Sequence, residues 1–177
     1  MVEGAGKALD DFLASGPNMG RGFARIQSYL FRVEPWAEFD DLKQGLTLDG
    51  PAHEATNAEL VDALDQALEK ANRAYALYVN ARVALETFEA EAEATEGALR
   101  APAAEQLQKE KAAGERSKAI TDADVVAEAA RRAPDEWRSL AERRARAKRS
   151  VDYLERLADL WKKRSDVLDT LVKTNRR

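Results

Sequence analysis

Two long series of apolar residues, spaced alternately by three and four positions, constrain the fold of this chain more than any other feature. One series runs from Leu60 to Ala92 and the other from Trp137 to Val172. Residues at this spacing share one stripe of an α-helix, and a stripe this long must be buried against another helix. The sequence therefore predicts an all-α fold, a long antiparallel helical hairpin that oligomerises through its helices. Eight large side chains mark this core and oligomer seam: Leu64, Tyr78, Leu85, Phe88, Trp137, Leu154, Trp161 and Leu168.

Capping signals predict where the first long helix begins. Thr56 is followed three residues later by Glu59, the spacing of a capping box, so the helix should start at Thr56 or Asn57. No helix-breaking residue follows before Gly97, which predicts a helix to about Ala94.

Residues 98–119 are rich in Ala, Lys, Glu and Gln and carry almost no large apolar residue. Either an exposed helix or a connector fits this composition. Pro102 and Gly114 favour the connector, because proline and glycine both disfavour a helix interior.

A second capping signature, Thr121-Asp122-Ala123-Asp124, predicts a short helix at the bend of the hairpin that ends at Ala133. Pro134 follows, and proline suits the first turn of a helix, where its missing N–H costs nothing. The last long helix is therefore predicted from about 135 to 174.

Residues 1–56 differ in composition from the helical assembly domain predicted over residues 57–177. They contain six of the twelve aromatic residues among several glycines and prolines. We expect short helices near 5–14 and 21–33, a break at Pro35 and then a turn-rich link. This N-terminal segment is too short to build its own core, so it packs on the helical body or on a neighbouring subunit, or serves as an arm that docks on a partner protein.

Composition argues against catalysis and against a cofactor. The chain has no cysteine and a single histidine, His53, so no thiolate or histidine metal site can be assembled. No glycine-rich phosphate loop is present. No apolar run approaches the roughly 20 residues that span a bilayer. We therefore expect a non-enzymatic protein with no metal and no membrane partner, in the cytoplasm of a bacterium or a phage-infected cell.

Positive charge is concentrated in the C-terminal quarter. Residues 131–177 hold 15 Lys and Arg against 8 Asp and Glu, a local charge of +7, whereas the other 130 residues carry −11. The densest run lies in residues 143–149. An anionic partner would relieve the repulsion among these cations, and either nucleic-acid phosphate or the acidic end of another copy's first helix could supply it. A solvated charge run is an equally good interpretation.

The C-terminal two-thirds of the chain resembles the UvsY-like phage recombination mediators. The similarity lies in Lys118-Ala119-Ile120-Thr121-Asp122-Ala123-Asp124-Val125, in the helix that contains Trp137, and in the stretch from Asp159-Leu160-Trp161-Lys162-Lys163-Arg164-Ser165 to Leu168. A long helix precedes these elements, as it does in the family.

The resemblance implies a helical protomer that forms a ring-shaped homo-oligomer and binds single-stranded DNA. It also implies two protein partners, a recombinase and the single-strand-binding protein that covers the strand. The family has a basic cluster near the end of its first long helix, where this chain is acidic, over residues 86–96. DNA contact would therefore fall to nine other cations: Arg143, Arg144, Arg146, Lys148, Arg149, Lys109, Lys111, Arg116 and Lys118.

Two functional hypotheses follow from these observations. The first is a recombination mediator that holds single-stranded DNA electrostatically and helps load a recombinase. The second is a structural or assembly protein of a virion or bacterial machine, in which opposite charges on the two long helices set the register between subunits. Only the first predicts binding of nucleic acid.

Overall fold

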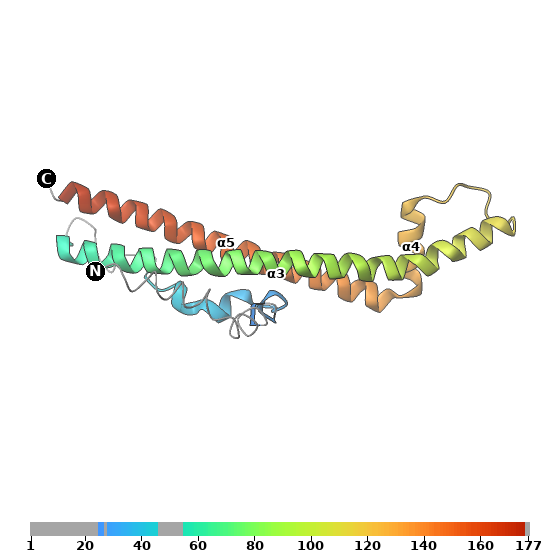
Figure 1. Ribbon diagram of the computed structural model, residues 1–177, viewed down its shortest axis with the longest axis horizontal. Coiled ribbons are helices and arrows are strands. Elements are labelled where there is room, and N and C mark those ends of the chain that lie inside the picture. Colours follow the sequence, from blue (N-terminus) through green and yellow to red (C-terminus); the bar gives the residue numbers. More distant parts are fainter. Residues whose placement is uncertain (1–24, 27, 46–54, 176–177) are drawn as a thin grey trace. The chain divides into compact units, whose positions relative to one another are not determined.

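The all-α prediction is confirmed. The structure, a computed structural model, describes residues 25–26, 28–45 and 55–175. This part of the chain contains no strand (Figure 1). It comprises helical residues at 25–26 and 28–30, a 3-10 helix, η1 (Pro35–Leu42), and the α-helices α3 (Asn57–Ala112), α4 (Asp122–Arg132) and α5 (Pro134–Asn175).

Contacts within the chain divide it into two compact units. Unit 1 comprises Met1–Leu85 and Ala147–Arg177, and unit 2 comprises Glu86–Arg146. Helices α3 and α5 each contribute one segment to unit 1 and another to unit 2, whereas α4 lies entirely in unit 2.

Helix α3 begins where the capping box predicts. The backbone N–H of Thr56 donates to Glu59 Oε2 at 2.7 Å, and the Glu59 N–H donates to Thr56 Oγ1 at 3.3 Å. These reciprocal bonds satisfy two backbone donors that a helix start would leave unpaired. The bond from the Thr56 N–H, and a further bond from the Thr56 hydroxyl to Glu59 Oε2 at 2.8 Å, lower the pKa of the Glu59 carboxyl, since they favour its ionised form.

The prediction of a connector after Gly97 is wrong for residues 98–112, which continue α3. A proline inside a helix costs roughly 3 kcal/mol relative to alanine. Packing in unit 2 offsets this cost, because Ala103 and Leu107, four residues apart, are both buried. Leu107 is a large apolar residue in a stretch whose composition suggested exposure.

Gly114 ends α3 in a Schellman motif. Its φ angle is +77°, a conformation that glycine adopts without steric cost. The Gly114 N–H donates to the Lys111 carbonyl at 3.1 Å, and the Glu115 N–H donates to the Glu110 carbonyl at 2.9 Å. The helix thus ends in the turn at Gly114, 17 residues after Gly97, the first breaker after the predicted end near Ala94.

Helices α4 and α5 follow the predicted bounds closely. Thr121 is the N-cap of α4, and it forms a capping box with Asp124. Pro134 occupies the first position of α5, where its missing N–H leaves no bond unmade. Two acidic residues, Asp135 and Glu136, follow it in the first turn and interact favourably with the positive end of the helix.

In unit 1, the segments of α3 and α5 run antiparallel. Tyr78 donates a hydrogen bond to Glu155 at 3.1 Å, and the Lys70 ammonium lies 5.1 Å from the centre of the Trp161 ring. Residues later in α3 thus contact residues earlier in α5, as expected for antiparallel helices. Small side chains of α3 and large side chains of α5 are buried in this core: Ala67, Ala74, Ala81, Leu154, Trp161 and Leu168.

The eight predicted seam residues are not equally buried. Phe88, Leu154, Trp161 and Leu168 are buried. Leu64, Tyr78, Leu85 and Trp137 are half-buried. The deepest positions of α3 in unit 1 instead belong to Leu60 and to a series of alanines seven residues apart.

The described part of the N-terminal segment packs on α3 and α5 within unit 1. Trp161 Nε1 donates to the Leu42 carbonyl at 2.6 Å, and Ser150 Oγ donates to the Leu30 carbonyl at 3.1 Å. Lys70 Nζ donates to the Gln44 carbonyl at 2.7 Å. Residues 30–44 therefore pack on the helical body, the first of the alternatives considered above.

The predicted helix near 21–33 is described in part, since residues 25, 26 and 28–30 are helical. η1 replaces the turn-rich link expected after Pro35. The predicted helix near 5–14 and the residue His53 lie outside the described residues.

Replacing Trp161 by Phe should destabilise the protein by about 1–3 kcal/mol, because the buried Leu42 carbonyl would lose its donor. Urea unfolding measures the change. Trp36→Phe is the matched control: Trp36 is 43% exposed, and a surface substitution usually changes stability by less than about 0.5 kcal/mol. Equal effects of the two substitutions would contradict the assigned role of the indole N–H.

Replacing Gly97 or Gly114 by alanine should change the stability of the protein in opposite directions. Gly97 lies inside the helix, and an added Cβ would meet no atom within 4 Å, so Gly97→Ala should stabilise the protein by about 1 kcal/mol. Gly114→Ala should destabilise it by about 1–2 kcal/mol, because its φ is positive. Thermal unfolding of both variants provides the measurement, and a shift of the same sign in both would contradict the assigned end of α3.

Candidate nucleic-acid interface

Four of the nine predicted DNA-contact residues are engaged within unit 2. Arg144 pairs with Glu96 at 2.7 Å, Arg116 with Asp124 at 2.7 Å and Arg146 with Glu142 at 3.3 Å. The Arg143 guanidinium lies 5.1 Å from the centre of the Phe88 ring, within the range of a cation–π interaction. Arg143 and Arg144 connect α5 to α3. Arg116 connects the loop before α4 to that helix, and Arg146 pairs within α5. Binding of phosphate would compete with these contacts.

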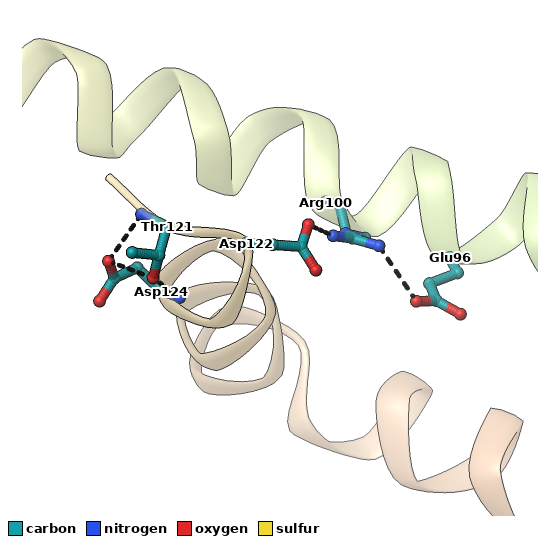
Figure 2. A network of polar contacts seen from close by, with 5 residues as sticks. All are labelled: Glu96, Arg100, Thr121, Asp122 and Asp124. Atoms are coloured by element: carbon teal, nitrogen blue, oxygen red, sulfur yellow. Dashed lines mark hydrogen bonds and ion pairs between the residues drawn. The ribbon is translucent and has the colours of Figure 1, made fainter. Parts of the chain in front are cut away.

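Glu96 and Arg100 of α3 together connect the three helices of unit 2. One carboxylate oxygen of Glu96 pairs with Arg144 of α5, and the other pairs at 3.4 Å with Arg100, one turn further along α3. Arg100 also pairs with Asp122 in the first turn of α4 (Figure 2). Part of the acidic stretch over residues 86–96, where the family is basic, is thus used to neutralise arginines of the same unit.

The start of α4 carries the most strongly shifted carboxyl of the described residues. Asp124 accepts hydrogen bonds from the Thr121 backbone and hydroxyl (Figure 2). These two bonds, followed by a hydrogen bond from Arg116, lower the pKa of Asp124 to about 2. All three favour the ionised carboxylate. Asp124 therefore joins the cap of α4 to a cation of the loop that precedes it.

Three of the predicted cations in unit 2 remain exposed. Lys109 and Lys111 belong to the last turn of α3, and Lys118 belongs to the loop that leads to α4. Among the described residues, no ion pair involves any of the three. The turn at Gly114 separates the two lysines of the helix from the lysine of the loop.

In unit 1, Lys148 and Arg149 are also exposed and form no ion pair with another described residue. Arg156 is a related cation that was not among the predicted site residues. The signal that could have found it is its spacing, because Arg149, Arg156 and Lys163 follow one another at intervals of seven residues. All three side chains are exposed on α5.

A surface hollow of about 450 Å³ in unit 2 does not suit an anionic ligand. Its apolar part comprises Phe88, Ala92 and Leu140. Three carboxylates, those of Glu91, Asp135 and Glu136, line it beside a single cation, Arg143. Among the described residues, no group of three or more His, Cys, Asp or Glu side chains could hold a metal ion.

Comparison with protein-family models, with curated proteins and with solved structures finds no match to this chain. The resemblance to the UvsY-like mediators therefore rests on the residues quoted above. In the described part of the chain, no helix is both long enough and apolar enough to cross a membrane.

The capping carboxylate predicts a pH dependence. The folded-state pKa of Asp124, about 2, lies below its ordinary value, so its contribution to stability is present above about pH 4 and is lost as the pH falls towards 2. Asp124→Asn should lower the melting temperature at pH 6, and the difference from wild type should shrink as the pH approaches 2. Asp159→Asn, at an exposed carboxylate, is the matched control. A difference between wild type and Asp124→Asn that stays constant with pH would contradict the assignment.

Proposed function

We propose that the protein is a non-enzymatic recombination mediator that binds single-stranded DNA as a homo-oligomer and helps load a recombinase onto it. The observation that carries the proposal is that Lys109, Lys111 and Lys118 are exposed and that no carboxylate of the described residues neutralises them. Lys118 begins the Lys118–Val125 stretch that resembles the mediator family. We call these three residues, which lie within ten positions of the sequence, the lysine cluster.

The ion pairs of unit 2 reduce the number of predicted cations that are available to bind DNA phosphate. A paired arginine such as Arg144 offers little net charge to a phosphate, because Glu96 already neutralises it. An exposed lysine instead releases the counterions that surround the strand, which is the main source of non-specific affinity for nucleic acid. A few such contacts on each subunit add up through avidity when several subunits bind one strand.

The mode of binding is electrostatic rather than aromatic. Trp161 is buried and donates its N–H to Leu42, so its ring is committed to the core of unit 1. Contacts to phosphate carry no sequence information, so the proposed binding tolerates any base sequence. Such tolerance suits a protein that loads a recombinase along a whole strand.

Fluorescence anisotropy with labelled oligo-dT tests the proposal. We expect salt-sensitive binding, with tighter binding to the single strand than to a duplex of the same length. The triple variant K109E/K111E/K118E should weaken binding at least tenfold at low salt. It should also reduce the slope of log affinity against log salt by about 2 for each bound subunit, since each phosphate contact on a single strand contributes about 0.7.

A matched control reverses three other exposed cations, in the variant R138E/K162E/K173E. Its net charge equals that of the lysine-cluster variant, so a purely global charge effect would weaken both variants equally and contradict the assigned site. Wild-type protein that fails to bind oligo-dT at low salt would contradict the mediator function itself.

The second candidate is a structural or assembly protein without affinity for nucleic acid. The ion pairs of Arg144, Arg116 and Arg100 favour it, because they show basic residues used to hold helices together. The same anisotropy experiment separates the two candidates. Under this alternative, Lys109 and Lys111 only contribute favourable charge at the negative end of α3.

A further inference from the structure

Unit 1 leaves an apolar stripe of α3 exposed to solvent. Leu68, Tyr75 and Val79 are 45%, 61% and 38% exposed, respectively. Steps of seven and four residues place them on one side of the helix, next to the side that packs against α5. Single exposed apolar residues are ordinary, but an aligned series on a helix is typical of an interaction surface.

Acidic residues border one side of this stripe. Asp62 and Glu69 are seven residues apart, and both are exposed. At about 100° per residue, they lie together on the flank of the line through Leu68 and Tyr75. Neither forms an ion pair with another residue that the structure describes.

The α5 segment of unit 1 presents a similar stripe with the opposite charge. Leu160 and Val167, seven residues apart, are 50% and 59% exposed. Arg156 and Lys163, also seven residues apart, lie beside them on the same outer side of the helix and are exposed. Asp159 lies three and four residues from these cations, yet it pairs with neither, so both charges remain available.

We propose that the apolar stripe of α3 in one copy of the protein docks on the Leu160–Val167 side of α5 in a second copy. Each surface combines two apolar residues one heptad apart with two charges one heptad apart, and the charges are of opposite sign. Apolar residues at the centre with complementary charges at the edge are the arrangement by which helices of a coiled coil select their partners. The charge complementarity identifies a second copy as the occupant.

This interface deepens the proposed function, because it names the surfaces through which the homo-oligomer assembles. It uses none of the residues of the lysine cluster. Loss of the interface and loss of DNA binding can therefore be measured independently.

Cross-linking through introduced cysteines tests the interface without DNA, since the chain has no cysteine of its own. Isotope-labelled Leu68→Cys protein is mixed with unlabelled Leu160→Cys or Val167→Cys protein and treated with a short bismaleimide. Mass spectrometry then distinguishes mixed dimers from dimers of one variant. We expect mixed dimers to exceed either homodimer at least fivefold, and Glu105→Cys, at an exposed residue of unit 2, to give none above background.

A charge exchange provides the second measurement. Both D62K/E69K and R156E/K163E should sediment as smaller species than the wild type, and mixing the two variants should restore the larger species. Predominant homodimers in the cross-linking experiment, or failure of the mixture to recover, would overturn the proposed pairing. Oligo-dT binding by a protein that does not cross-link would overturn only the interface, whereas cross-linking without oligo-dT binding would overturn only the mediator function.

Discussion

The contact between small residues of α3 and large residues of α5 is the constraint on which unit 1 depends. Ala67, Ala74 and Ala81 are all buried, and their small side chains allow the two helices to approach closely. Trp161 of α5 is buried in the same unit and donates to the Leu42 carbonyl. The N-terminal segment is held through this bond and that of Ser150, so its position depends on the pairing of the two helices.

Local signals in the sequence were sufficient to predict where the helices begin. The Thr56–Glu59 and Thr121–Asp124 capping boxes involve residues three positions apart, so their bonds can be inferred without knowledge of the tertiary structure. The continuation of α3 through Pro102 could not be predicted in this way. It depends on the burial of Ala103 and Leu107, and burial is set by what packs against the helix.

The candidate site shows the same distinction between local and long-range information. Residues 143–149 look like a free basic run, but Arg144 pairs with Glu96, a residue 48 positions away that no local pattern links to it. The acidic stretch over residues 86–96 likewise reads as a run of free carboxylates until the pairing of Glu96 with Arg144 and Arg100 is known. Charge density alone therefore overstated the number of available cations.

Once the ion pairs of unit 2 are assigned, the charges of the chain fall into two classes. Paired charges such as Glu96, Arg144 and Arg100 connect the helices. The exposed charges that form no ion pair with another described residue include the lysine cluster, which is suited to a polyanion, and Arg156 and Lys163 of α5, which are suited to an acidic helix. This division explains how a chain with a net charge of only −4 could bind DNA and also assemble with itself.

Amine-reactive footprinting of the lysines, with and without saturating oligo-dT, tests the account most directly. Mass spectrometry reports the modification of each lysine in the wild-type protein. The account predicts that DNA protects Lys109, Lys111 and Lys118, while the reactivity of Lys162 and Lys173 is unchanged. Unchanged reactivity of the lysine cluster in a protein that has bound the strand would contradict it.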